Sequence, residues 1–469
     1  MAKSVLKTPA ISIVGMGYVG LATAVCFANA GYPVLGVDID SAKVKTISSG
    51  TSPIHENAIE SLLKRSLRSK NFSISTDLEK AIAASKITFV TVGTPSRTNG
   101  DIDLKYVEGA IHSIAKSIGA KKDYHLVVVK STIVPGTTSE TILPLMKRVS
   151  GKAFPRDFGL CFNPELLREG SAVEDTLHPD ALIIGSQDER SSKFLLSLYK
   201  GFYGKNLPCT LITSPSNAEF VKYAVNSFRA TQITFLNSIA NLCESIPGTE
   251  ISEIVRGVST ITKMDPRYQK AGFGFGGSCW PKDLRALIAT FDKNGIPADL
   301  LKSVLLVNEN QAKRAIEIAR GSLGNLTGRR ISLLGLAFKA GTDDVRESVG
   351  IRISRLLISA GAIVSVYDPQ AMENGRRELG DVVEYSPSAR ACIRNTDCCI
   401  IATEWEEFRK ILPSEFRHLM RNPLIIEGRR SLDYERFEKD KVPLIQLGRY
   451  SSIENMSIES VSESIMVRK

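Results

Sequence analysis

The chain has 469 residues, of which 43% are hydrophobic and 23% are charged, and its formal net charge is +10. These fractions are ordinary for a globular protein and exclude disorder as the main state, and the length predicts two or three domains. No apolar run approaches the ~20 residues that cross a bilayer, so we expect no membrane partner. The one dense basic stretch, Lys64–Lys70, has no interleaved aromatic residues, so we expect no nucleic-acid partner.

Eight cysteines are scattered along the chain without a CxxC pair. This usage predicts neither a disulfide framework nor a zinc ribbon, and it favours a reducing compartment. Residues 1–10 also lack the apolar segment of a secretory signal. We therefore expect a cytoplasmic protein in which Cys161, Cys398 and Cys399 are small core residues.

Up to about residue 200, short apolar runs alternate with helical patterns, which is typical of a parallel sheet with crossover helices. Helices are predicted at Gly20–Ala30 and Tyr106–Ile118. The predicted strands are Ile11–Val14, Pro33–Val37, Ile87–Val92, Leu126–Lys130 and Ala181–Ile184.

The pattern changes at Ser216–Ser245, where apolar residues recur at steps of three, four and seven. These steps predict one long helix. Further helical segments follow to about Arg320, and Gly321–Gly328 is predicted to be a linker.

A second alternation of strands and helices then begins, with strands predicted at Ile331–Leu334, Val364–Tyr367, Cys398–Ile401 and Leu424–Ile426. The order strand, glycine, helix, strand, aspartate occurs twice, from Gly15 to Asp38 and from Gly335 to Asp368. The predicted fold is α/β, with two Rossmann-like doubly wound domains (1–212 and 323–469) joined by a central helical domain (213–322). We expect the polar stretch 451–469 to fray.

The segment Ile11–Gly20 is a predicted strand that runs into Gly-x-Gly-x-x-Gly (Gly15, Gly17 and Gly20) and a helix. Glycines there permit a tight turn and close approach of a pyrophosphate to the helix N-terminus. Asp38 ends the next predicted strand, where a carboxylate binds a ribose 2′-hydroxyl and repels a 2′-phosphate. The pattern predicts NAD rather than NADP; a purely structural glycine turn is the alternative.

The stretch Phe273–Asp283 has the sequence FGFGGSCWPKD. Its glycines allow backbone to come close to a ligand, and Pro281 suits the first turn of a following helix. Cys279 would then lie at a helix N-terminus, where the dipole favours thiolate over thiol. This setting distinguishes Cys279 from the cysteines predicted to lie in the core.

Lys222 and Asn226 are four residues apart on the long predicted helix, so they share a face. That face can offer a cation and an amide to a developing oxyanion, although residues at this spacing are commonly only surface residues. The segment Asn163–Gly170 adds two carboxylates in a turn-like sequence, which alone is ambiguous.

Further motifs occur in a recognisable order along the chain. They are the first fingerprint, Val37–Asp40 with Lys43, Pro53–Glu56, Gly93–Pro95, Lys130–Thr132, Asn163–Gly170, Ala218–Tyr223, the Cys279 loop, Gly335–Lys339 and Asp343–Ser348. Over nearly its whole length the chain resembles the UDP-glucose/GDP-mannose dehydrogenase family.

The resemblance implies an enzyme that oxidises the C6 hydroxyl of a nucleotide sugar to a carboxylate with two NAD, most of all UDP-glucose to UDP-glucuronate. A cysteine traps the intermediate aldehyde as a thiohemiacetal and then carries a thioester, which activated water hydrolyses. By family position the catalytic residues are Cys279, Glu165 as the base, Thr132 and Asp283 to order the water, and Lys222 and Asn226 to stabilise the oxyanion.

The resemblance also assigns residues to the two ligands. The cofactor-binding positions are Gly15, Gly17, Val19, Gly20, Asp38, Lys43, Thr94, Thr132, Glu169, Lys282 and Arg346. The substrate-binding positions are Glu165, Leu166, Leu167, Arg168, Glu169, Lys222, Asn226, Tyr268, Gln269, Lys270, Ala271, Gly272, Gly276, Lys339 and Arg429.

Several positions depart from the pattern of the UDP-glucose members. Arg267 directly precedes Tyr268 without an Arg-Ile-Gly triplet, which is similar to the GDP-mannose members, and Leu166, Trp280 and Glu427 also differ. GDP-mannose or a UDP-N-acetylhexosamine therefore stays an alternative substrate. A two-electron hydroxyacid dehydrogenase and a non-enzymatic NAD-binding regulator are the alternative functions.

The long predicted helix carries more apolar residues than one catalytic face would use, among them Phe220, Phe228, Phe235 and Ile239. In the family that the chain resembles, the central domain forms a two-fold interface. We therefore expect a homodimer, or a larger assembly built from it, held by residues of about 216–316. Coverage of this surface by the flanking domains is the alternative.

Overall fold

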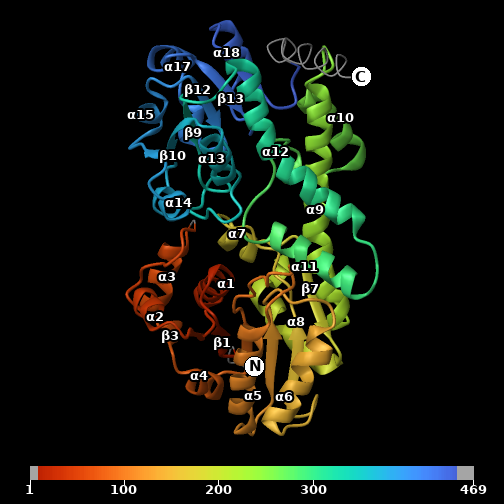
Figure 1. Ribbon diagram of the computed structural model, residues 1–469. Coiled ribbons are helices and arrows are strands. Elements are labelled where there is room, and N and C mark those ends of the chain that lie inside the picture. Colours follow the sequence, from red (N-terminus) through yellow and green to blue (C-terminus); the bar gives the residue numbers. More distant parts are fainter. Residues whose placement is uncertain (1–8, 57, 451–469) are drawn as a thin grey trace. The chain divides into compact units, whose positions relative to one another are not determined.

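The computed structural model describes residues 9–56 and 58–450 (Figure 1), so the stretch 451–469 that we expect to fray lies outside the described residues. The described residues divide into two compact units. The first holds the residues up to Val225 with Arg285–Asn294, and the second holds Asn226–Leu284 with the residues from Gly295 on. The division falls inside two helices, α9 (Pro215–Cys243) and α11 (Trp280–Lys293).

Within the described residues, the first unit is built on an eight-stranded sheet in the order β3-β2-β1-β4-β5-β6-β7-β8. Neighbouring strands are parallel except β6 and β7, which pair antiparallel. The register aligns Ile11 of β1 with Val34 of β2 and with Ile87 of β4. The strands are β1 (Ile11–Val14), β2 (Val34–Val37), β3 (Phe72–Ser75), β4 (Ile87–Val90), β5 (His125–Val129), β6 (Phe158–Phe162), β7 (Leu182–Ser186) and β8 (Thr210–Thr213).

Helices cover both faces of this sheet because alternate residues of its central strands enter different cores. Ile13 and Phe89 pack in one core, whereas Val14 and Val90 pack in the other. The first core is closed by α1 (Tyr18–Asn29), α2 (Ser41–Ser48), α3 (Ile59–Arg68), α7 (Ala172–Leu177) and α8 (Glu189–Tyr203), which the short turn η2 (Gly204–Asn206) follows. The second core is closed by α4 (Leu78–Ala84), α5 (Lys105–Gly119), the π-helical turn η1 (Thr138–Ile142) and α6 (Leu143–Ser150).

The second unit contains a sheet with the same winding. Over the described residues it has six parallel strands in the order β11-β10-β9-β12-β13-β14, which repeats the order of the first six strands of the other sheet. The strands are β9 (Arg330–Leu334), β10 (Ile363–Tyr367), β11 (Glu384–Tyr385), β12 (Cys398–Ile401), β13 (Leu424–Glu427) and β14 (Leu444–Gln446).

Two helical layers also cover the second sheet. Leu333 and Ile400 face one core, and Leu334 and Ile401 face the other. The first core is closed by α12 (Asp299–Leu323), α13 (Val349–Ser359) and α14 (Met372–Leu379). The second is closed by α15 (Ala389–Ile393), α16 (Glu406–Arg409), α17 (Pro413–Leu419) and α18 (Tyr434–Lys439).

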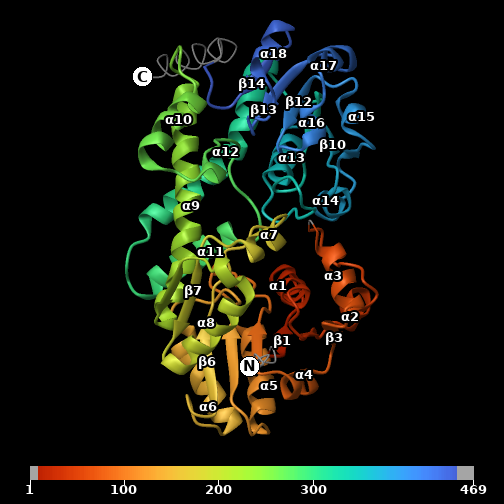
Figure 2. The same cartoon turned by 180° about the vertical axis from the view of Figure 1, so that it is seen from behind.

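Apart from the helices α13 to α18, the described helices of the second unit are the later part of α9, α10 (Ile251–Thr262), the turn η3 (Pro266–Tyr268), the first turn of α11 and α12 (Figures 1 and 2). The residues between η3 and α11 belong to no helix or strand. The helix α12 lies against the end of α9, where Gln311 Nε2 is 3.3 Å from Asn241 Oδ1, and Arg314 Nη2 is 2.8 Å from Oε2 of Glu244, the residue after α9. The single long helix predicted from the apolar steps is confirmed, since α9 runs from Pro215 to Cys243 without a break.

The predicted fold class is confirmed, and every predicted strand is present with its ends shifted by at most two residues. The sequence pattern does not predict β3, β6, β8, β11 or β14. Of these, β3, β8, β11 and β14 are the edge strands of the two sheets, and β6 contains Gly159. The predicted linker is wrong at its start. The helix α12 continues to Leu323, and Gly324, with a φ of +73°, follows its end.

Cys161, Cys398 and Cys399 lie in the cores of the sheets and are 0% exposed, as predicted. Burial raises the pKa of Cys161 and Cys399 to about 12. These thiols are therefore unreactive at neutral pH, because the thiolate is the nucleophile.

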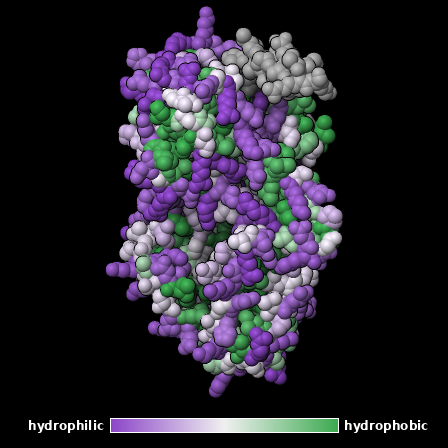
Figure 3. All heavy atoms as spheres, viewed as in Figure 1, coloured by the Kyte–Doolittle hydropathy of each residue, from purple (hydrophilic) through white to green (hydrophobic). Residues whose placement is uncertain are grey.

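Hydrophilic residues cover most of the face seen in Figure 3, and apolar residues gather over α9 and α10. None of the helices in the part of the chain that the structure describes is long and apolar enough to span a membrane.

A buried polar chain joins three strands of the first sheet near their amino ends. Thr88 Oγ1 lies 2.7 Å from Ser12 Oγ and 2.6 Å from His125 Nε2. On the other side of the imidazole, Lys121 Nζ lies 3.1 Å from His125 Nδ1 and donates to the Ser85 carbonyl at 2.6 Å. Burial and the charge of Lys121 lower the pKa of His125 to about 3, so the folded protein holds this imidazole neutral.

We predict that His125 makes the fold sensitive to acid. Its folded pKa of about 3 lies below the ordinary value of 6.5, so the unfolded chain binds one more proton between these pH values. The free energy of unfolding therefore falls as the pH drops below about 6.5, by at most about 1.4 kcal/mol per pH unit from this group. Urea unfolding between neutral pH and about pH 4.5 should show a shallower loss of stability in His125→Asn than in wild type.

The matched control is His112→Asn, which changes an exposed histidine of α5. This variant should follow the wild-type pH dependence. An unchanged pH dependence in His125→Asn would contradict the prediction.

Candidate active site

The turn between β1 and α1 requires glycine at two positions. Gly15 has a φ of +97°, and a Cβ there would lie 2.9 Å from the Thr91 carbonyl. A Cβ at Gly20 would lie 1.8 Å from the Gly15 carbonyl oxygen. The helix α1 begins after Gly17, which carries no side chain to cap it, and a helix N-terminus of this kind is where phosphate binds. The turn therefore fits the predicted dinucleotide.

Asp38 directly follows β2 and is 6% exposed. Its Oδ2 accepts hydrogen bonds from Met16 N at 2.8 Å and Lys43 Nζ at 2.9 Å, and its Oδ1 accepts one from Asp40 N at 3.0 Å. Burial raises the pKa of this carboxyl, but the hydrogen bonds and the charge of Lys43 outweigh burial, so the pKa lies below its usual value. The structure thus brings the predicted Asp38 and Lys43 together, and an anionic acceptor here suits ribose hydroxyls.

The second sheet repeats this turn but uses its carboxylate differently. A Cβ at Gly350 would lie 2.1 Å from the Gly335 carbonyl oxygen, which matches the close approach in the first turn. Asp368 follows β10, and its Oδ2 accepts hydrogen bonds from Leu336 N at 2.8 Å and Trp405 Nε1 at 3.1 Å. The carboxylate of the second repeat therefore has a tryptophan N–H as its side-chain partner, whereas Asp38 is paired with the partly exposed Lys43.

Four of the remaining predicted cofactor positions lie in the first unit: Val19, Thr94, Thr132 and Glu169. Thr94 and Thr132 are half-buried in the loops after β4 and β5, at the carboxyl edge of the sheet where ligands bind in such folds. Arg346 lies in the second unit, where its Nη2 is 2.6 Å from Asp344 Oδ2. Its cofactor role stays a prediction.

Lys222 of α9 and Glu165 form a buried ion pair in the first unit. Lys222 Nζ lies 2.6 Å from Glu165 Oε1 and donates to the Glu165 carbonyl at 2.8 Å. The two side chains are 3% and 8% exposed. Leu167 N donates to Glu165 Oε2 at 2.8 Å, and Leu166 and Leu167 are half-buried. The structure therefore brings the predicted base and the predicted cation into direct contact.

Two carboxylates hold the segment that follows Glu165. Arg168, predicted to bind substrate, pairs with Asp175 of α7 through Nη2 and Oδ1 at 2.6 Å. Glu56 accepts a hydrogen bond from Gly170 N at 2.7 Å at the start of α7. The motif Pro53–Glu56 predicts no role for Glu56, although its carboxylate was the available signal.

Lys130, which follows β5, is a second residue for which the sequence predicts no role. Lys130 Nζ donates to Asn163 Oδ1 at 2.8 Å, and Tyr199 OH donates to the same oxygen at 2.5 Å. Burial lowers the pKa of Lys130 to about 8, with the charge of Glu165 opposing and that of Lys222 adding to the shift. A lysine directly after a fully buried strand was the signal that could have found it.

The second unit holds the other predicted catalytic residues. Asn226 of α9 donates from Nδ2 to Asp283 Oδ2 at 2.7 Å, and Lys282 Nζ lies 2.7 Å from Asp283 Oδ1. Cys279 is half-buried and directly precedes α11, with Ser278 Oγ 3.5 Å from its sulfur. Asp283 N donates to the Cys279 carbonyl at 2.8 Å. One turn of helix thus carries Cys279, Lys282 and Asp283, and Asn226 binds it.

Glycines bring the Cys279 loop against the chain that follows β9. A Cβ at Gly276 would lie 2.3 Å from the Glu347 carbonyl oxygen. Gly277, with a φ of +89°, donates from its N–H to the Arg346 carbonyl at 3.1 Å. Side chains are therefore excluded at both positions.

The predicted substrate segment Tyr268–Gly272 precedes this loop. The Tyr268 ring is 5.7 Å from that of Trp280 and is 6% exposed. The Arg229 guanidinium lies 4.7 Å from the centre of the Tyr268 ring, within the range of a cation–π contact. The residues of this segment that line a pocket of about 490 Å³ beside α10 are Gln269, Lys270 and Ala271.

Lys339 and Arg429, the predicted nucleotide-binding residues of the second sheet, follow β9 and β13. Lys339 Nζ lies 5.6 Å from the centre of the Phe338 ring. Arg429 donates from Nε to the Ala402 carbonyl at 2.7 Å and from Nη1 to the Gly274 carbonyl at 3.3 Å. Arg429 therefore ties the Cys279 loop to the carboxyl edge of this sheet.

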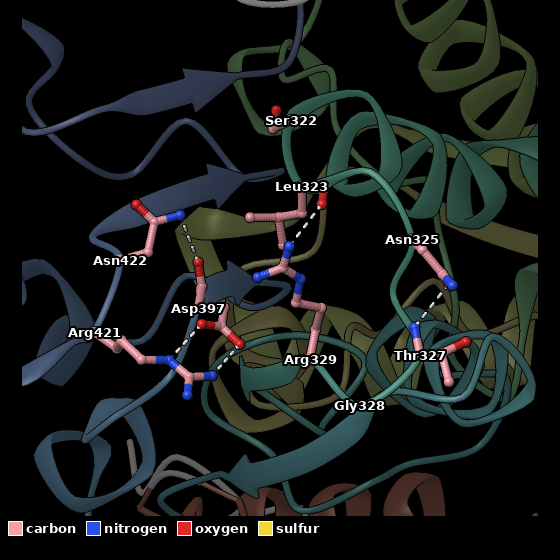
Figure 4. Close-up of a pocket in the computed structure, with 9 residues that line it drawn as sticks. All are labelled: Ser322, Leu323, Asn325, Thr327, Gly328, Arg329, Asp397, Arg421 and Asn422. Atoms are coloured by element: carbon pink, nitrogen blue, oxygen red, sulfur yellow. Dashed lines mark hydrogen bonds and ion pairs between the residues drawn. The ribbon is translucent and has the colours of Figure 1, made fainter.

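A larger pocket of about 850 Å³ lies at the opposite edge of the second sheet (Figure 4). Asp397, before β12, accepts a bidentate pair from Arg421 at 2.7 and 2.5 Å. Arg329 points to the Leu323 carbonyl and donates to it at 3.2 Å. These charged groups bind within the protein, and the amino ends of the strands are not where such sheets hold ligands.

Comparison with known proteins covers all three parts of the chain. Residues 9–203, 216–310 and 332–434 match the NAD binding domain, the central domain and the UDP binding domain of one family. The chain belongs to the UDP-glucose/GDP-mannose dehydrogenase family. The resemblance inferred from the sequence motifs is therefore confirmed.

Curated and solved relatives agree with this assignment. The chain is 38% identical to the UDP-glucose 6-dehydrogenase AglM of Haloferax volcanii, over 91% of this chain and 99% of that protein. A UDP-glucose dehydrogenase from Pyrobaculum islandicum is 37% identical with a TM-score of 0.87, covering 96% and 100% of the two chains. A UDP-D-ManNAc dehydrogenase from Pyrococcus horikoshii is 28% identical with a TM-score of 0.81, covering 94% and 99%.

As a member of this dehydrogenase family the chain is an oxidoreductase, and its cofactor is NAD, as the match to the NAD binding domain confirms. The match to the UDP binding domain indicates a nucleotide sugar as the class of substrate. Both predictions from the sequence are therefore confirmed at this level.

We predict that Asp38→Ser weakens the use of NAD and narrows the gap to NADP. The variant loses the anionic acceptor for the ribose hydroxyls and the repulsion of a 2′-phosphate. Because hydrogen bonds to charged groups contribute about 1.5–3 kcal/mol, the KM for NAD should rise roughly 10- to 100-fold. Steady-state kinetics with each dinucleotide measure the change.

The matched control is Asp40→Ser, two residues further on. Asp40 caps α2, and serine is an equally good cap, so the KM for NAD should stay near wild type. Equal KM values for NAD in Asp38→Ser and wild type would show that Asp38 does not bind the ribose.

Proposed function

We propose that this protein oxidises the C6 hydroxyl of UDP-glucose to a carboxylate and so forms UDP-glucuronate, with two NAD per sugar. The observation that carries the proposal is a half-buried thiol, Cys279, placed directly before α11 and one turn from the Asn226–Asp283 pair. A two-electron dehydrogenase needs no nucleophile there. A four-electron oxidation does, because its aldehyde intermediate must be held for the second step.

In the first oxidation O6 gives its proton to a water as hydride leaves C6, and Lys222 Nζ and Asn226 Nδ2 hydrogen-bond to O6 and stabilise its alkoxide character. Bound NAD supplies the hydride acceptor for both oxidations. The helix α9 carries Lys222 and Asn226 one turn apart, and their carboxylate partners fix each side chain. The Asn226 amide has a second N–H, which is the donor for a substrate oxygen.

In the second stage Cys279 Sγ adds to the aldehyde carbon and forms a thiohemiacetal, which the second oxidation converts to a thioester. Thr132 and Asp283 order a water, and Glu165 takes its proton as the water attacks the thioester carbon. The C–S bond then breaks and releases the carboxylate. The sulfur leaves as a thiolate, which the N-terminus of α11 favours.

We propose that the three predicted domains have separate roles. Residues 1–212 bind NAD, residues 213–322 carry the catalytic lysine, asparagine and cysteine, and residues 323–469 bind the nucleotide of the substrate. A cytoplasmic location stays our proposal from the cysteine usage of the sequence.

GDP-mannose and UDP-N-acetylhexosamines are the alternative substrates. The relative named for UDP-D-ManNAc, which is 28% identical to this chain, supports the second of them. The experiment that tests the proposal is incubation with NAD and each nucleotide sugar in turn. We expect two NADH and one uronate per UDP-glucose consumed. One NADH per sugar, with an aldehyde or ketone as the product, would favour the two-electron alternative. Turnover of another nucleotide sugar but not of UDP-glucose would make that sugar the substrate.

Cys279→Ala should abolish uronate formation and leave NAD affinity nearly unchanged. The thiol bonds to the substrate carbon, whereas the glycine turn and Asp38 that bind the cofactor lie elsewhere in the chain. Product analysis and NAD titration of the folded variant measure both effects. Cys209→Ala, which removes an exposed thiol, is the control and should keep full activity; a comparable loss of NAD affinity in Cys279→Ala would instead make Cys279 structural.

We also propose that the protein is a homodimer, or a larger assembly, held by residues of about 216–316. Phe228, Phe235 and Leu242 of α9 are 66%, 53% and 55% exposed and recur every seven residues. This spacing makes one apolar stripe along a helix, and apolar residues gather over α9 and α10 in Figure 3. A second copy of the same stripe is a self-complementary partner.

Light scattering should give at least twice the chain mass of 51.2 kDa. Phe228→Glu with Phe235→Glu should lower this mass to that of the monomer, because each charge would be buried unpaired in the interface. Val382→Glu, at a residue that is also 66% exposed, is the control and should keep the assembly. A monomeric, active wild-type protein would contradict the proposal.

A further inference from the structure

The segment that leads to Cys279 has no regular secondary structure and is nevertheless buried. Ala271, Phe273 and Phe275 are 2%, 0% and 6% exposed, and no helix or strand includes residues 271–279. Buried backbone N–H and C=O groups need partners. Side chains from neighbouring helices must therefore supply what a sheet or helix ladder would otherwise provide.

Asn308 of α12 supplies both partners of one peptide unit. Phe275 N donates to Asn308 Oδ1 at 2.7 Å, and Asn308 Nδ2 donates to the Phe275 carbonyl at 3.0 Å. Asn308 is 3% exposed. Its side-chain amide thus pairs with the backbone of Phe275 as a neighbouring strand would.

Asn308 also lies close to the residue before Phe275. Gly274 has a φ of +100°, and a Cβ there would lie 2.6 Å from Asn308 Oδ1. Earlier in the segment, Asn237 of α9 is 0% exposed and accepts a hydrogen bond from Gly272 N at 2.8 Å. Two helices therefore grip the segment through amide side chains.

We propose that Asn308 is a positioning residue for Cys279, because its amide fixes the Phe275 peptide four residues before the thiol. The inference rests on the proposed function only in taking Cys279 as the nucleophile. Asn308 touches neither sugar nor cofactor in this account. It acts by holding the backbone that presents Cys279 at the N-terminus of α11.

The choice of asparagine follows from the two bonds. An aspartate keeps the acceptor for Phe275 N but places an oxygen against the Phe275 carbonyl, where both atoms are acceptors. A serine is too short to bridge both groups. Either change removes at least one of the two hydrogen bonds that hold the Phe275 peptide, without changing any residue of the Cys279 loop.

The test measures the thiol directly, so it does not depend on turnover. The rate of alkylation of Cys279 by iodoacetamide is followed against pH by mass spectrometry of its peptide, in wild type, Asn308→Asp and Asn308→Ser. The exposed Cys209 is the internal reference. We expect the half-maximal pH for Cys279 to rise by about one unit, since a displaced sulfur loses the helix N-terminus, while that for Cys209 stays unchanged.

The steady-state readout is the split between kcat and KM. With UDP-glucose, kcat should fall by about 100-fold, the effect of a misplacement of about 1 Å, and the KM for NAD should stay within about threefold. A loss of stability alone would lower the amount of folded enzyme and leave the pH profile of alkylation as in wild type.

The matched control is Gln311→Leu, three residues along α12. Gln311 is 1% exposed and donates to Asn241 Oδ1 at 3.3 Å, so it is equally buried and its hydrogen bond goes to α9 instead of the Cys279 loop. An alkylation profile of the folded Asn308 variants equal to wild type, or an equal shift in Gln311→Leu, would overturn the proposal. If wild type does not turn over UDP-glucose, the proposed function fails, and the alkylation profiles still decide the role of Asn308.

Discussion

One turn of α9 presents a lysine and an asparagine, and a buried carboxylate holds each of them. Lys222 binds Glu165 at 2.6 Å, and Asn226 binds Asp283 at 2.7 Å. A charge that is 3% exposed, as Lys222 is, is tolerated only with a partner, because removing one member of such a pair costs about 3–5 kcal/mol. The loop after β6 must therefore bring the carboxylate of Glu165 to Lys222.

Glycine makes the other close approaches of backbone that this arrangement needs. A Cβ at Gly20, Gly350 or Gly272 would lie 1.8, 2.1 or 2.2 Å from a carbonyl oxygen. Gly20 and Gly350 belong to the repeated turn. Gly272, directly before the Cys279 loop, lies against Gly428 in the loop after β13. The same turn serves a cofactor in the first sheet and an internal hydrogen-bond network around Asp368 in the second, because Trp405 and backbone N–H groups satisfy that carboxylate.

Several buried glutamates accept hydrogen bonds from backbone N–H groups in loops or at the start of a helix, where no strand or helix partner is available. Glu219 accepts hydrogen bonds from Gly136 N and Thr138 N at 2.6 and 2.8 Å, one turn before Lys222 on α9. Glu244 accepts one from Gly448 N at 2.9 Å, and Glu427 accepts one from Arg429 N at 2.8 Å. Burial raises the pKa of Glu219 to about 7 against these hydrogen bonds. A buried glutamate thus satisfies backbone N–H donors, and the free-energy cost is the desolvation of its carboxyl group.

The sequence by itself determined the fold class and the cofactor, because these follow from local patterns: the period of apolar residues, the glycine spacing and an acid after the second strand. It also pointed to Cys279, since a glycine-rich stretch before a helix has a fixed chemical meaning. Only the tertiary structure decided that Asp368 is used internally, that Glu56 and Lys130 support the Glu165 segment, and that Asn308 holds the Phe275 peptide. These contacts join residues 32 to 114 positions apart, and no local pattern encodes them, because a buried polar group acquires its partner only when distant segments pack together.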